Sequence, residues 1–178
     1  TIPTAMHIAT VLLIKRELLP AISKIKKSLK KKVKEFNKVI KIGRTHTQDA
    51  TPIKLSNEFL AFHDQIDYAE KKILQSLSKL FQLAQGGTAV GSGVNAPKDF
   101  SKNFIKNLQK LTKLPFKSAS NKYEALASHD VFIEVMSSME ILTSSVFKMA
   151  NDIRVLSSGP RSGIAELILP ANEPGSSI

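Results

Sequence analysis

The chain contains no cysteine, which excludes a disulfide scaffold, a thiolate zinc site and a cysteine-bound iron–sulfur cluster within these 178 residues. Long apolar runs are missing too, since no stretch approaches the roughly 18 uncharged apolar residues that a membrane helix needs. The uncharged segment from Ile2 to Ile14 is too short, and His7 interrupts it. The start of the chain shows no signal-peptide pattern. We therefore predict no membrane partner.

Metal-ligand spacing is also missing. No two of the four histidines share such spacing with a carboxylate. His129 and Asp130 are neighbours in sequence, so they face apart on a helix and form no catalytic dyad. His7, His63 and His129 lie within helical patterns with no polar cluster around them, and we interpret them as structural. The sequence therefore predicts neither a metal site nor a cofactor.

Positive charge is in excess, with a net charge of +11 at pH 7. In the most basic stretch, apolar residues keep steps of three and four and form one helical stripe, with lysines on the remaining surface. The lysines of this stretch are Lys24, Lys26, Lys27, Lys30, Lys31, Lys32, Lys34, Lys38 and Lys41. No aromatic residues suited to base stacking are interleaved with them. We interpret the run as a solvated helix face and predict no nucleic-acid partner; the alternative is a non-catalytic basic helical scaffold.

Helical periodicity organises most of the chain. Long helices are predicted over about residues 3–40, 52–84 and 122–156, and a shorter helix around Phe104 ends before Pro115. No period-two alternation is long enough for a sheet. The predicted fold class is therefore all-α.

The second long helix has the clearest signals. Thr51 is a suitable N-cap, Pro52 fits the first helical position, and Gly86-Gly87 follows as a C-terminal cap. Its apolar stripe is Leu55, Phe59, Phe62, Ile66, Ala69, Ile73, Leu77, Leu80 and Ala84. The stripe predicted for the third helix is Phe132, Met136, Met139, Thr143, Val146, Ala150 and Ile153.

Helices of this length cannot bury their stripes inside a compact domain of this size, because ordinary globular helices have about three turns. We therefore predict an elongated bundle of long antiparallel helices, shared with other chains. The four methionines (Met6, Met136, Met139 and Met149) are interpreted as core residues.

Three polar segments between the helices could carry a site: residues 43–52, 86–93 and 170–178. The glycine-rich segment 86–93 lacks the Lys-Ser/Thr pair of a nucleotide-binding P-loop and follows no strand, so it is interpreted as a turn. In the first segment, His46 stands beside Arg44 and Thr45 ahead of a helix start, a setting that favours anions. The residues alone lead to a helical bundle with an anion-binding loop.

Four blocks of sequence resemble class II fumarases, within the fumarase/aspartase superfamily. They are GRTHTQDATP (43–52), LAQGGTAVGSG (83–93), NKYEALASHD (121–130) and LPANEPGSSI (169–178). The resemblance extends over essentially the whole chain. Aspartases have Gln where this chain has His46, so the first block favours fumarase over an aspartase-like lyase that also releases fumarate.

The resemblance implies an enzyme that reversibly hydrates fumarate to (S)-malate without a metal, through an aci-carboxylate intermediate. Ser176 corresponds to the base that removes the proton from the carbon beside a carboxylate, and His46 to the residue that transfers a proton on the water side. Thr45 and Ser177 correspond to positions that contact the substrate carboxylates. The family forms homotetramers in which three subunits build each site.

The resemblance also implies that residues 1–178 are part of the central helical-bundle domain, without the N- and C-terminal domains. Active-site segments of the family lie just before Thr1 and just after Ile178, so we expect this segment by itself to be inactive. A place in the tricarboxylic acid cycle and a cytoplasmic location are further expectations, with a mitochondrial one if a transit peptide lies upstream.

Overall fold

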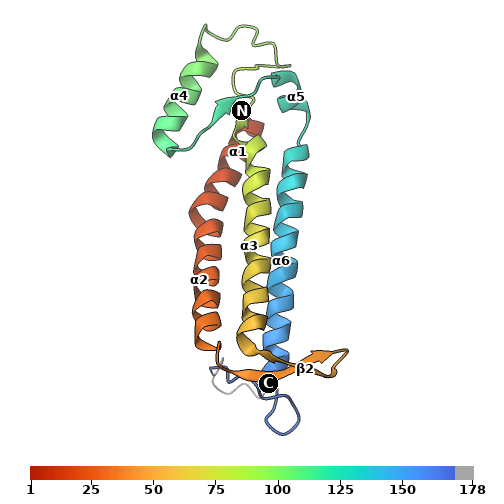
Figure 1. Cartoon of the computed structure of the whole chain (residues 1–178). Coiled ribbons are helices and arrows are strands. Elements are labelled where there is room, and N and C mark those ends of the chain that lie inside the picture. The colour runs from red at the N-terminus through yellow and green to blue at the C-terminus, as the bar shows by residue number, and fades with distance from the viewer. Residues whose placement is uncertain (171–178) are drawn as a thin grey trace, which may run out of the picture.

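The computed structural model describes residues 1–170, and three long helical rods dominate it (Figure 1). The first rod joins α1 (Ile2–Leu13), a π-helical turn η1 (Ile14–Leu18) and α2 (Leu19–Glu35); the others are α3 (Leu55–Leu80) and α6 (Asp130–Leu156). In Figure 1 the chain descends through the first rod, rises through α3 and descends through α6, and α3 packs against both neighbours. The predicted helical fold is confirmed.

The core follows the apolar stripe of α3. Every residue of the stripe predicted for this helix is buried, from Leu55 to Ala84. Ile22 and Leu29 of α2 and Val135 and Leu142 of α6 pack into the same cluster. Since burying one such aliphatic side chain contributes about 1.5–3 kcal/mol, this cluster is the main force that holds the rods together.

The first rod differs from the single helix predicted over residues 3–40. Pro20 has no N–H to donate to the preceding turn, and the π-helical turn η1 lies directly before it, where it accommodates the missing hydrogen bond. The rod also ends earlier, at Glu35, because Phe36 leaves helical geometry with φ −92° and ψ 7°. Ile40 instead begins a strand.

The expectation of no sheet was wrong for residues 40–54. Strands β1 (Ile40–Thr45) and β2 (Gln48–Lys54) form an antiparallel hairpin, labelled by β2 at the lower end of Figure 1. Thr51 and Pro52 therefore belong to a strand, and the N-cap of α3 is Lys54. Pro52 is tolerated because each strand of a two-stranded sheet has an outer edge that needs no donor.

The opposite end of the bundle carries shorter elements. Strands β3 (Gln82–Leu83) and β4 (Lys117–Ser118) pair in parallel, and α4 (Phe100–Thr112) lies between them in the chain. Because α3 ends at Leu80 and runs into β3, Gly86-Gly87 does not cap it, contrary to the prediction.

The helix predicted over residues 122–156 is interrupted after its first turns. Helix α5 (Lys122–Ala127) is capped by Asn121, whose side chain accepts hydrogen bonds from the backbone N–H groups of Tyr123 and Glu124. The chain then extends at Ser128, and α6 starts after His129. His129 is therefore the N-cap of α6 and not an interior helix residue.

The buried stripe of α6 is shifted by about one residue from the one predicted. Its fully buried members are Val131, Val135, Ser138, Leu142 and Leu156. Of the predicted stripe, Phe132, Met139, Val146 and Ile153 are partly buried, but Met136 is 59% exposed. Met6 is 41% exposed too, so neither methionine belongs to the core of this chain. The helix thus carries apolar side chains on two faces, of which α3 covers one.

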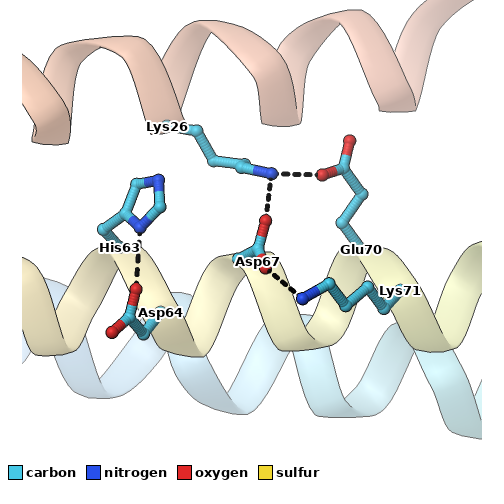
Figure 2. A network of polar contacts seen from close by, with 6 residues as sticks. All are labelled: Lys26, His63, Asp64, Asp67, Glu70 and Lys71. Carbon is cyan, nitrogen blue, oxygen red and sulfur yellow. Dashed lines mark hydrogen bonds and ion pairs between the residues drawn. The ribbon is translucent and has the colours of Figure 1, made fainter.

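A polar network joins α2 to α3 halfway along the bundle (Figure 2). The ammonium group of Lys26 on α2 donates to the carboxylates of Asp67 and Glu70 on α3, and Lys71 contacts Asp67 from the other side. The hydrogen bonds from Lys26 and Lys71 hold the pKa of Asp67 well below its usual range, and those carboxylates raise the pKa of Lys26. This lysine is therefore paired and not part of a purely solvated face.

Candidate active site

The tip of the β1–β2 hairpin carries two of the residues singled out by sequence. Thr45 ends β1 and pairs with Gln48, which leaves His46 and Thr47 as a two-residue turn. Both turn residues have positive φ, 51° and 62°. Two-residue hairpin turns require this backbone, but it disfavours residues other than Gly, Asn and Asp, and a β-branched Thr most of all. A strained tip that displays His46 and Thr45 to solvent is a feature typical of functional sites.

The pairing of the hairpin shifts register just before this tip. Between the pairs Ile42–Pro52 and Arg44–Asp49, β1 advances by two residues and β2 by three, so the extra residue lies in β2, opposite Gly43. A Cβ at Gly43 would lie 2.7 Å from the backbone oxygen of Thr51, so only glycine lets the strands approach this closely. Lys41 and Arg44 are three residues apart in β1, and both of their long side chains reach Glu166 in the loop after α6.

Four charged side chains meet beside β1, and we call them the Glu166 cluster: Lys41, Arg44, Glu58 and Glu166. The ammonium nitrogen of Lys41 lies 2.7 Å from Glu58 Oε1 and 2.6 Å from Glu166 Oε2. The guanidinium of Arg44 donates to the other oxygen of Glu166. Two cations and two carboxylates therefore balance, and the Lys41 side chain is only 7% exposed.

The electrostatics of the cluster favour its charged form. Burial raises the pKa of Glu166, but the hydrogen bonds from Arg44 and Lys41 outweigh burial, so this pKa lies below its ordinary value. The hydrogen bond to Glu166 raises the pKa of Arg44. Glu166 is thus a carboxylate that accepts a hydrogen bond from Arg44 and forms an ion pair with Lys41, an arrangement stronger than a single surface ion pair.

Lys41 was predicted to lie on a solvated helix face, which is wrong because it belongs to β1 and its side chain is buried; Glu58 and Glu166 were not predicted as site residues. A signal was present for Glu166, because it is the one acidic side chain between residues 153 and 172 and stands inside the apolar patch 164–169. An isolated charge in a segment that packs against the protein needs a partner. Arg44 was recognised as part of the anion-favouring loop, but the structure shows its guanidinium bound to Glu166.

A hollow of about 480 Å³ lies beside this cluster. Arg44 and Thr47 of the hairpin line it together with Glu58 and Gln65 of α3 and Lys148 of α6. One oxygen of Glu58 and the side-chain oxygen of Gln65 are buried with no hydrogen-bond partner in the part of the chain that the structure describes. Close packing therefore does not fill the space between the hairpin and the two helices.

Comparison with known proteins assigns a family to this chain. The model of a family described as lyase matches residues 1–178. The chain belongs to this lyase family. It is 53% identical over 176 residues to the class II fumarate hydratase of Rickettsia conorii, and 51% identical over 178 residues to the mitochondrial fumarate hydratase of Dictyostelium discoideum. These alignments cover 99% and 100% of this chain, which spans only 38% and 37% of the length of those relatives.

The fold of the lyase chain agrees with that of solved relatives. It superposes on the crystal structure of a class II fumarase from Schistosoma mansoni with a TM-score of 0.94 and 38% identity. That match covers 99% of this chain and 40% of the other. The rods and the hairpin are therefore those of a fumarase-like helical region.

The remaining predicted site residues of this lyase, Ser176 and Ser177, lie outside the described residues. The segment that leads to them approaches the hairpin, because Glu166 contacts both Lys41 and Arg44. In Figure 1, α3 begins and α6 ends at the same end of the bundle. The structure thus brings His46 and Thr45 to the end at which the chain continues toward Ser176.

The other three histidines of the lyase lie away from the hairpin tip. His7 Nδ1 lies 3.1 Å from the backbone oxygen of Leu80, and burial lowers its pKa despite that hydrogen bond. His63 is buried on α3 beside Asp64, 2.9 Å away (Figure 2), and His129 caps α6. Within residues 1–170, His, Asp and Glu side chains form no group of three that could hold a metal ion. No helix in that range has the length and apolar character to cross a membrane.

Proposed function

We propose that this chain is the central helical part of a class II fumarate hydratase, which adds water to fumarate to give (S)-malate and catalyses the reverse reaction. The observation that carries this proposal is identity above 50% to fumarate hydratases over essentially the whole chain. The strained, exposed turn at His46 supports it independently, since backbone strain at a polar residue is typical of catalytic sites.

The chemistry assigns a role to each predicted residue. In the dehydration of malate to fumarate, Ser176 removes a proton from the carbon beside a carboxylate. The electron pair moves into that carboxylate, which becomes an aci-carboxylate dianion. Hydrogen-bond donors placed in advance, among them Thr45 and Ser177, stabilise this charge. His46 then delivers a proton as the hydroxyl leaves as water. Hydration follows the same steps in reverse.

We propose further that the protein works as a homotetramer whose sites are shared between subunits. The second apolar face of α6 supports assembly, because Ile133, Met136, Phe147 and Val155 are all more than half exposed on one long helix. Side chains of this size are rarely left uncovered in a contiguous patch. The exposed hairpin tip supports sharing, since a His46 displayed away from the rods can enter a site on a neighbouring subunit.

The proposed activity is tested on the complete protein produced from its natural gene. Loss of the ultraviolet absorbance of fumarate, with malate formed in equal amount, is the expected result. Aspartate offered as substrate separates the two lyase activities, and we expect no fumarate from it. Release of fumarate from aspartate with no turnover of malate would contradict the proposal and assign an aspartase-like reaction instead.

A further inference from the structure

The Glu166 cluster connects the two segments that carry the predicted catalytic residues. Arg44 directly precedes Thr45 and His46, whereas Glu166 stands ten residues before Ser176. We propose that Glu166 is a positioning residue of the hydratase, which fixes the place of the His46 hairpin on the end of the helical bundle. This inference rests on the function proposed above and adds to it a residue that touches neither substrate nor the reacting atoms.

The backbone around Glu166 is itself anchored. Its N–H donates to the carbonyl of Leu156 at 2.8 Å, and the N–H of Leu167 donates to the same carbonyl at 3.1 Å. The N–H of Ala165 donates to the carbonyl of Ser158. These bonds satisfy carbonyls at the C-terminal end of α6, where helices leave acceptors free. Glu166 therefore projects from a loop that is fixed to the end of a long rigid helix.

Among residues 1–170, backbone hydrogen bonds to the rest of the structure anchor the hairpin only at its base. Its base is closed by the hydrogen bond from the N–H of Leu55 to the carbonyl of Val39, at 2.9 Å. Between the base and the tip, the hollow described above separates the hairpin from α3 and α6. Apolar packing cannot set the position of the tip across such a space. The contacts of Lys41 and Arg44 with Glu166 bridge it.

The long side chains of Lys41 and Arg44 make this bridge. Lys41 contacts one oxygen of Glu166, and Arg44 donates to the other. Lys41 also contacts Glu58 on α3, so the cluster joins three parts of the structure: β1, α3 and the loop after α6. A planar guanidinium and a carboxylate constrain direction as well as distance. The geometry therefore determines where Thr45 and His46 lie relative to the loop.

Loss of the Glu166 carboxylate should affect turnover more than substrate binding. A catalytic group that moves by about 1 Å can cost on the order of 100-fold in rate. We expect Glu166→Gln in the complete protein to lower kcat for fumarate at least about tenfold, with KM within about threefold of wild type. The matched control is Glu70→Gln, which removes a similarly half-buried, lysine-paired carboxylate from the middle of the bundle; its kcat should stay within about twofold.

Hydrogen exchange measured by mass spectrometry tests the bridge independently of activity. Glu166→Gln should speed exchange of the backbone amides in both 40–54 and 164–170, while those of α3 and α6 keep their wild-type protection. Glu70→Gln should leave both segments unchanged. If wild type does not hydrate fumarate, the proposed function fails, and exchange alone then decides whether the bridge exists.

Two results would overturn the inference. One is a Glu166→Gln protein with wild-type kcat, in which the carboxylate does not position the site. The other is unchanged exchange in either 40–54 or 164–170, which would show that the two segments are held without Glu166. Equal loss of protection along α3 and α6 would mean that the residue supports the fold as a whole and would also count against a positioning role.

Discussion

His46 can be substituted with little risk to the fold because of its backbone conformation and exposure. His46 is exposed and has a φ of 51°, a conformation in which Asn is among the most favourable residues. Its side chain makes no hydrogen bond within residues 1–170 that would be lost on substitution. A change of chemistry at this position can therefore be separated from a change of stability.

The variant His46→Asn should lower kcat by about 10²–10⁴-fold, with a much smaller change in KM, because a proton-transfer group acts in the transition state. Steady-state kinetics on the complete protein measure both constants. His129→Asn serves as the control, since it makes the same substitution at an exposed histidine at the other end of the bundle. A kcat for His46→Asn within twofold of wild type would reject its catalytic role.

Individual site residues could be predicted from the sequence where they belong to one motif, but not where folding brings distant residues together. Thr45 and His46 belong to one contiguous block, so a resemblance is enough to find them. Lys41 and Glu166 are 125 positions apart, and they meet only because the loop after α6 lies against β1. A contact between segments so distant in the sequence leaves no pattern in either segment alone.

Among the elements, α3 was predictable and the hairpin was not. Helix α3 is buried along one stripe, so its sequence repeats the helical period over many turns. The hairpin is short, and its alternation is broken by Gly43 in β1 and by Pro52 in β2. Thr51-Pro52 also matches the usual start of a helix, which led to the wrong N-cap. The long basic run concealed the ion pair of Lys26, because its acidic partners lie on another helix.

The α2–α3 network gives a prediction for stability. Lys26→Ala leaves Asp67 and Glu70 facing each other without their shared cation, and all three side chains are less than a third exposed. We expect a loss of about 1–3 kcal/mol, between the values for surface and buried pairs. Thermal unfolding should show a lower Tm for this variant than for Lys30→Ala, an exposed lysine on the same helix.

The pH dependence of this effect follows from the pKa of Asp67. Hydrogen bonds from Lys26 and Lys71 lower this pKa in the folded state, so the stabilisation is present above the unfolded pKa of about 4 and is lost as pH falls through the folded value. The Tm difference between wild type and Lys26→Ala should therefore be largest near about pH 7 and shrink toward about pH 3. A difference that grows on acidification would show that the network does not stabilise the bundle.

For the whole molecule, the unexpected feature is the second apolar face of α6. Length alone predicted that the rods need partners, but the stripe predicted for α6 fell between its two apolar faces. When a helix is apolar on two faces, its apolar residues do not follow a single helical period, because residues that face α3 alternate in the sequence with residues that face a partner. This explains why Met136 is exposed here although the pattern indicated a core residue.

Disruption of this face should separate the subunits. Phe147 is 70% exposed on α6, so Phe147→Glu places a charge where we propose that a partner helix packs. Sedimentation of the complete protein should then show species smaller than the tetramer that we propose for wild type. Leu111→Glu is the control, because Leu111 is even more exposed but lies on α4. A Phe147→Glu tetramer as stable as wild type would place the interface elsewhere.

The central claim is that this chain supplies His46 and Ser176 to active sites shared between subunits, and subunit mixing tests it most directly. Two inactive complete proteins, His46→Asn and Ser176→Ala, are mixed, dissociated and reassembled. If each site takes these residues from different subunits, roughly one site in four of a randomly mixed tetramer receives both wild-type side chains. Fumarate hydration should therefore return to about a quarter of the wild-type rate. Hybrid tetramers that mass spectrometry shows to have formed, yet no more active than either parent, would contradict the account.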